Sequence, residues 1–86
     1  MPQISSFYGI VIMMFYNDHQ PPHFHSRYSE NGAQIRISDF TVIEGELPSR
    51  AIKLIKEWGQ KHKTELEKNW ELCRGGMKPK KIEPLQ

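Results

Sequence analysis

Cysteine is almost absent from this sequence: Cys73 is the only one among 86 residues. Neither an intramolecular disulfide nor a cysteine-based zinc cluster can therefore form. Long hydrophobic runs are also missing, because the apolar stretch over residues 8–16 is too short to cross a bilayer as a helix. The N-terminus lacks the basic segment of a secretory signal. Together these absences predict a cytoplasmic protein with no membrane segment.

Charge of one sign does not dominate either, since the net charge is +2. Its distribution is uneven, however: residues 1–47 carry two basic and five acidic side chains, whereas residues 48–86 carry ten basic and five acidic ones. The basic half could attract RNA or a small acidic partner protein through its summed field. The alternative is an ordinary solvated helix face. The candidate contacts are Lys53, Lys56, Lys61 and Lys63.

The chain does contain enough aromatic and aliphatic side chains for one ordered core. We expect a single domain over residues 1–76, followed by an extended basic tail with two prolines over residues 77–86. A domain this small buries a low fraction of its surface, so a homodimer or a partner chain is expected to cover what remains.

Strands are expected in the first half of the domain. The continuous apolar stretch over residues 8–16 predicts a strand covered on both faces. Asn31-Gly32 predicts a tight hairpin between strands at residues 24–28 and 33–38, because Asn-Gly supplies the positive φ angles of such a turn. A last strand follows at residues 40–44.

A helix is expected from Pro48 to the glycine pair Gly75-Gly76. Proline suits a first helical turn, where its missing N–H has no partner, and glycine permits a left-handed cap. Gly59 interrupts the pattern, so either a kink or two shorter helices would result. His62 is expected to be a hydrogen-bonded core residue. The sequence therefore predicts an α+β domain: an antiparallel β-meander of three to four strands followed by a long helix packed on one face.

The segment Asp18–His25, which we call the histidine turn, is the only chemically unusual one. If Phe24 points into the core, strand alternation sends His23 and His25 together to the opposite face. His19 lies four residues before His23 across a proline pair and can return to the same place.

Three interpretations of this turn are open. Three imidazole nitrogens and a carboxylate oxygen would suit a zinc or nickel site, with Asp18, His19, His23 and His25 as ligands. The same three histidines could instead be catalytic residues, acting as acid and base on an RNA 2′-hydroxyl. The third interpretation is a structural turn, fixed by the prolines and by Asp18 hydrogen-bonding its own backbone.

Several parts of the sequence together form a recognisable pattern. They are residues 4–10, 17–25, 44–48, Trp58, residues 69–72 and residues 82–85. The chain closely resembles a bacterial family called domain of unknown function 4160, over nearly its whole length. The Asp-His-x-Pro-Pro-His-Phe-His segment is specific to that family.

The resemblance implies a small stand-alone cytoplasmic protein, often encoded beside a second small protein in an arrangement similar to toxin–antitoxin pairs. We therefore expect an interaction protein of a two-gene module, which binds its partner and RNA. The alternative is a histidine-dependent ribonuclease or a metal-dependent hydrolase that uses His19, His23 and His25. An enzyme and a non-enzyme both remain open.

Overall fold

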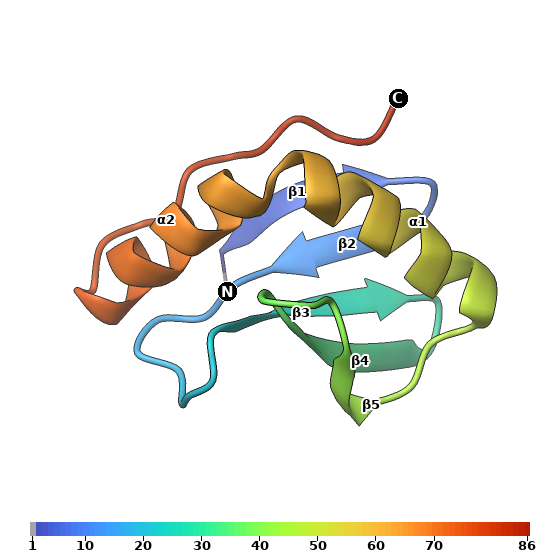
Figure 1. Ribbon diagram of the computed structural model, residues 1–86, viewed down its shortest axis with the longest axis horizontal. Helices are drawn as coiled ribbons and strands as arrows, with labels where there is room; N and C mark the ends of the chain where they lie inside the picture. The colour runs from blue at the N-terminus through green and yellow to red at the C-terminus, as the bar shows by residue number, and fades with distance from the viewer. Residues whose placement is uncertain (1) are drawn as a thin grey trace.

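The computed structural model describes residues 2–86 and is an α+β fold, as predicted. A five-stranded antiparallel sheet, in which the strand order follows the chain order, precedes two helices. The helices lie across one face of the sheet (Figure 1). The elements are β1 (Gln3–Phe7), β2 (Ile10–Met13), β3 (His23–Tyr28), β4 (Asn31–Arg36), β5 (Val42–Gly45), α1 (Ser49–Lys61) and α2 (Lys63–Arg74).

The sheet has one strand more than the three to four predicted, and the additional strand is β1. Ile4 has no partner in the register, because Gln3 pairs with Met13 and Ser5 already pairs with Ile12. This bulge turns both Ile4 and Ser5 toward the interior, where both are buried. The bulge hides the alternation that would have marked the strand in the sequence.

The expectation of one strand over residues 8–16 that is covered on both faces is wrong. Tyr8 and Gly9 form the turn between β1 and β2, each with a positive φ, and Tyr8 is exposed. Within β2, buried residues alternate with half-buried ones. The half-buried side chains, Val11 and Met13, belong to the face away from the helices, which we call the outer face.

The hairpin of β3 and β4 forms as predicted, but its turn lies two residues earlier than expected. Tyr28 pairs with Asn31, so Ser29 and Glu30 make the two-residue loop and Ser29 takes a positive φ. Asn31 and Gly32 belong to β4 instead.

Of the two alternatives for the helical segment, a kinked long helix or two shorter helices, the structure has two helices, but the break lies around His62, where α1 ends and α2 begins, and not at Gly59. His62 has φ −125° and its backbone N–H donates to the Gly59 carbonyl, which closes the end of α1. Gly59 itself stays helical. A Cβ atom there would lie 2.8 Å from Cζ and 2.9 Å from Cδ1 of Phe40. Gly59 is thus needed because the ring of Phe40 packs directly against the helix backbone, not because the helix bends there.

We therefore expect Gly59→Ala to destabilise the protein by about 1–3 kcal/mol, through overpacking against Phe40. The sign of the stability change distinguishes packing from helix propensity, because propensity alone would make the alanine variant more stable by about 1 kcal/mol. Urea unfolding followed by tryptophan fluorescence would measure the change. Gly75→Ala is the control: an added Cβ there meets only ordinary contacts at 3.6 and 3.7 Å. A stabilised Gly59→Ala variant would contradict the packing explanation.

The core lies between the sheet and the helices, and the C-terminal tail (residues 77–86) is part of it. Trp58 is fully buried, and its indole N–H donates to the carbonyl of Glu83 at 2.8 Å. Ile82 and Leu85 are buried, and the Ile82 N–H donates to the carbonyl of Ile4. Over residues 2–86, neither helix combines the length and the hydrophobicity that a membrane span requires.

Candidate metal centre

The loop between β2 and β3 carries Asp18 back to the beginning of β3. Asn17 has a positive φ of 52°, a conformation that asparagine tolerates better than most residues. Its backbone N–H donates to the carbonyl of Cys73 in the last turn of α2. The loop is thereby fixed to the helix end, and the Asp18 side chain faces the histidines.

Asp18 joins all three histidines of the turn. Its Oδ2 atom accepts a hydrogen bond from His25 Nε2 at 2.9 Å and lies 3.0 Å from His23 Nε2. Its Oδ1 atom accepts from the ring Nδ1 of His19 at 2.8 Å and from the His19 backbone N–H at 2.9 Å. Partial burial alone would raise the pKa of Asp18, but the hydrogen bonds from His25 and His19 hold it well below its usual range. Asp18 is therefore an ionised carboxylate at neutral pH.

His23 is fully buried, and one of its ring nitrogens has no hydrogen-bond partner. Nδ1 lies 2.7 Å from the carbonyl oxygen of Pro21, which can only accept, so Nδ1 carries a proton. In a neutral imidazole the Nε2 atom is then a bare lone pair. It faces the Asp18 carboxylate at 3.0 Å, which also presents a lone pair. Two acceptors at this distance repel each other unless a proton or a metal cation lies between them.

Three ligand atoms converge at this point. One from each of Asp18, His23 and His25 lie within 4.8 Å of one another. The oxygen-to-nitrogen separations of 2.9 and 3.0 Å suit an ion with bonds of about 2.0–2.2 Å to nitrogen and oxygen. The side chains of Asp18 and His25 are 16 % and 18 % exposed, so one side of the group remains open. We call these three residues the metal cluster.

The sequence proposed four ligands, and the structure brings three of them together. His19 contacts the other oxygen of Asp18, and its side chain is 67 % exposed. It is thus positioned beside the metal cluster, outside the group of converging atoms. The prediction that alternation places His23 and His25 side by side is confirmed, with ring centroids 5.1 Å apart.

A family model described as a domain of unknown function (DUF4160) matches residues 9–71. The chain belongs to the DUF4160 family. No curated protein and no solved structure matches it. The part of this DUF4160 chain that matches contains the whole histidine turn and Trp70, whereas β1 and the tail lie outside it.

Two aromatic residues of the DUF4160 site were missed in the sequence. The ring of Trp70, from α2, lies 5.3 Å from that of His23 and helps to bury it. Phe15, from the loop, lies 4.1 Å from the ring of His25. Phe15 is close in sequence to the histidine turn, so the sequence could have indicated that the two lie near each other. Trp70 is distant in sequence from the turn, and nothing in the sequence indicates its contact with His23.

The candidate contact lysines and His62 lie away from the metal cluster. Lys53, Lys56 and Lys61 are exposed on α1, which covers the face of the sheet opposite to the outer face. Lys63 donates to the carbonyl of Ser38 at 2.9 Å. The ring of His62 pairs with Glu65 at 2.6 Å, and His62 does not belong to the metal cluster.

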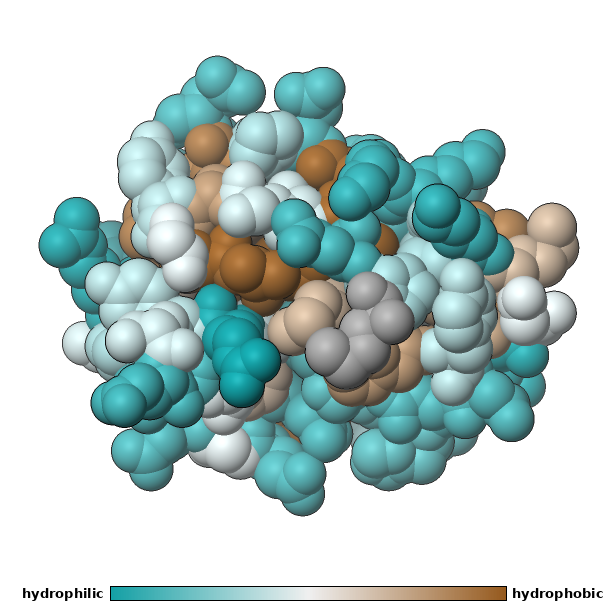
Figure 2. All heavy atoms as spheres, turned by 180° about the vertical axis from the view of Figure 1, so that it is seen from behind, coloured by the Kyte–Doolittle hydropathy of each residue, from teal (hydrophilic) through white to brown (hydrophobic). Residues whose placement is uncertain are grey.

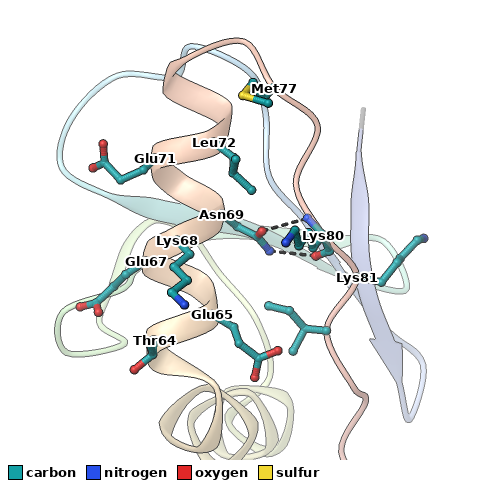
Figure 3. A pocket seen from close by; sticks show the side chains of 11 residues that line it. Thr64, Glu65, Glu67, Lys68, Asn69, Glu71, Leu72, Met77, Lys80 and Lys81 are labelled. Atoms are coloured by element: carbon teal, nitrogen blue, oxygen red, sulfur yellow. Dashed lines mark hydrogen bonds between the residues drawn. The ribbon is translucent and has the colours of Figure 1, made fainter.

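A groove of about 630 Å³ runs between α2 and the tail (Figure 3). Asn69 holds the tail in place by two hydrogen bonds of 2.9 Å with the backbone of Lys80. Leu72, Met77 and Ile82 give the groove an apolar lining. Lys80 and Lys81 lie on the tail side of the groove. The groove is separate from the metal cluster, none of whose residues lines it.

Proposed function

We propose that this DUF4160 protein is a metal-dependent hydrolase with zinc or nickel held by Asp18, His23 and His25. The unpartnered, buried Nε2 atom of His23 carries the proposal, because a metal ion turns its repulsion with Asp18 into two coordination bonds. Pro21 supports the same role: its carbonyl fixes the proton on Nδ1 and so directs the Nε2 lone pair inward, as partners of metal-binding histidines commonly do.

Three protein ligands with one open side are typical of a catalytic site, whereas structural zinc sites close with four. A metal ion in such a site lowers the pKa of its bound water to about 7 and provides a hydroxide nucleophile. His25 and Asp18 lie on the exposed side, so a substrate can reach this position. We place the protein in the cytoplasm, where its single, buried Cys73 stays a thiol.

Hydrolysis of bis(4-nitrophenyl) phosphate by protein purified without a histidine tag tests this proposal. The metal-loaded protein is expected to show turnover that a chelator abolishes and that added metal restores. His25→Ala should lower kcat/KM at least 100-fold, because it removes a ligand that faces the open side. His62→Ala is the matched control, since His62 also pairs with a carboxylate but lies outside the cluster. The same two-histidine, one-carboxylate donor set serves Fe(II) in oxygenases, so iron belongs in the loading series. Equal loss in both variants would contradict the assignment.

We propose as a second function that the protein binds a small acidic partner protein encoded by a neighbouring gene, in a toxin–antitoxin-like module. The groove between α2 and the tail supports a partner-binding role: it combines an apolar lining with Lys80 and Lys81 on the tail side, where an acidic side chain could pair, and with Glu65, Glu67 and Glu71 on α2. Met77, which also lines the groove, is 61 % exposed and adds apolar surface that a partner could cover.

Co-expression with the product of the neighbouring gene would test the second function. A Lys80→Glu, Lys81→Glu double change is expected to weaken the complex about 10-fold or more, because it opposes an acidic partner with like charge. The same reversal at Lys53 and Lys56 on α1 is the control for a general loss of positive charge. RNA binding that follows Lys53 and Lys56 instead would favour the helix lysines as the contact surface.

A further inference from the structure

The outer face of the sheet has a hollow of about 230 Å³ beside the metal cluster, and His25 is one of its walls. The side of the molecule away from the helices, shown in Figure 2, carries hydrophobic atoms in its middle, bordered by hydrophilic side chains. Met13 and Phe15 contribute apolar surface to the hollow, whereas Gln34 and Glu44 contribute polar groups. The hollow therefore connects an amphipathic surface to a residue that ligates the proposed metal.

Two glycines line this hollow, Gly32 and Gly45, and they differ in what an added side chain would meet. Gly45 has a positive φ of 81°, and a Cβ atom there would lie 3.0 Å from Cα of Ala33, so only glycine fits. Gly32 is different, because an added Cβ would meet only the carbonyl oxygen of Ser26 at an ordinary 3.7 Å. In the register Gly32 pairs with Arg27, so its missing side chain leaves room directly beside that arginine. Packing therefore does not require a glycine at position 32. The absence of a side chain at Gly32 leaves open space in the hollow.

Arg27 is the cation of the hollow, and it is exposed. Among residues 2–86, no carboxylate forms an ion pair with Arg27, whereas Arg36 pairs with Asp39 at 2.7 Å. Arg27 and His25 are two residues apart on β3 and thus share the outer face, about 7 Å apart along the strand. A guanidinium group binds phosphate oxygens through two parallel hydrogen bonds.

We infer that the hollow binds a phosphate ester, with Arg27 holding its anionic oxygens while the ester phosphorus faces the metal cluster. This inference rests on the proposed hydrolase function and names its substrate class. Glu44 accepts from Gln34 at 3.0 Å on the β5 side of the hollow and repels an anion there, which favours the Arg27 side for the phosphate. In the reaction, the oxygen of water forms a bond to phosphorus and the bond from phosphorus to the ester oxygen breaks. The departing oxygen takes up one proton, and the products are a phosphate with one ester bond fewer and an alcohol.

Arg27→Gln and Gly32→Val test the inference in the zinc-loaded protein. Arg27→Gln is expected to raise KM for bis(4-nitrophenyl) phosphate about 10- to 100-fold, the effect of losing hydrogen bonds to a charged group. The KM for the neutral ester 4-nitrophenyl acetate should not change. Gly32→Val fills the hollow from a position where the backbone accepts a side chain, and it should raise KM for the phosphodiester as well. Arg50→Gln is the matched control, because Arg50 is an exposed arginine in the first turn of α1, outside the hollow.

The outcomes separate this inference from the proposed function. If the wild-type protein binds no metal, the proposed function fails and the inference with it. If the wild type hydrolyses the phosphodiester and Arg27→Gln behaves like Arg50→Gln, the metal centre stands and the role of Arg27 is wrong. Binding of inorganic phosphate to the zinc-loaded protein gives the same comparison without turnover, and absence of such binding in the wild type overturns the inference.

Competition identifies the source of the phosphate. Stronger inhibition by a single-stranded RNA oligonucleotide would indicate a nucleic-acid substrate, whereas stronger inhibition by a nucleoside monophosphate would indicate a small ester. Inhibition by neither would contradict phosphate recognition in the hollow.

Discussion

Zinc at about 100-fold excess over its dissociation constant should stabilise the metal-free protein by about 2.7 kcal/mol, because it binds the folded chain and not the unfolded one. In a domain of this size, that corresponds to a rise in Tm on the order of 10 °C or more. Thermal unfolding followed by circular dichroism, with zinc and with nickel, would measure the shift. Because Asp18, His23 and His25 are already brought together in the fold, we expect a low dissociation constant, so that a modest zinc concentration reaches this excess.

The Tm shifts of substituted proteins would test where the ion binds. Asp18→Asn keeps the shape of the side chain but removes the charge, and it should abolish most of the shift. His25→Ala serves as a second test, since this partly exposed position tolerates truncation better than the buried His23. His62→Ala should retain the full shift. A wild-type protein whose Tm responds to none of the metals, or an Asp18→Asn variant that responds normally, would exclude the proposed centre.

Deletion of residues 80–86 is expected to lower the free energy of unfolding by about 3–6 kcal/mol. The two buried side chains Ile82 and Leu85 contribute about 1.5–3 kcal/mol each. A domain of this length has a total stability of about 4–13 kcal/mol, so the loss is a large part of it. Urea unfolding monitored by tryptophan fluorescence would follow the change, because Trp58 donates its indole N–H to the tail.

Substitutions in the full chain separate the contributions of packing and of charge in the tail to the free energy of unfolding. Ile82→Ala in the full chain should cost about 2–5 kcal/mol, as expected for a buried aliphatic side chain. The Lys78→Ala, Lys81→Ala double variant removes two exposed charges and should change stability by less than about 0.5 kcal/mol per site. If the lysine variant lost as much stability as Ile82→Ala, packing of the tail would not explain its contribution.

Local signals in the sequence were sufficient for much of the sheet and for the first helix. The alternation of Ala33 and Ile35 with Gln34 predicts a strand with one buried face, and the structure has it as β4. Pro48 predicts the beginning of a helix, and α1 begins at the next residue. These features depend on periodicity and on the geometry of single residues, which neighbours in the chain determine.

Features that depend on distant contacts were missed. β1 contains a bulge and three polar residues, so neither alternation nor composition marks it. Gly59 interrupts the helical pattern in the sequence, but the break occurs at His62. The reason for Gly59 is the ring of Phe40, which approaches from the connection before β5. Contacts between elements that are distant in the sequence decide features of this kind, and a short segment of sequence does not contain those contacts.

The candidate metal site also combines features that the local sequence predicts with features that depend on distant contacts. Its candidate ligands lie within eight residues, so alternation along β3 could place His23 and His25 together. The lone pair that gives His23 its chemical importance was not predictable, because it requires the carbonyl of Pro21 on one nitrogen and burial beneath Trp70. Arg27 was missed because its significance depends on the empty space at Gly32, across the hairpin.

The hydrogen bond from the Asn17 N–H to the Cys73 carbonyl connects the loop that carries Asp18 to the last turn of α2. Opening of the helix end and release of the loop are therefore expected to be parts of one local unfolding event, which binding of the proposed ion would make rarer. The amide proton of Asn17 would exchange with solvent more slowly when the ion is bound, although Asn17 is not a ligand. A residue outside the candidate ligands would thus report the binding of the proposed ion, and the end of α2 would share the rigidity that binding confers on the loop.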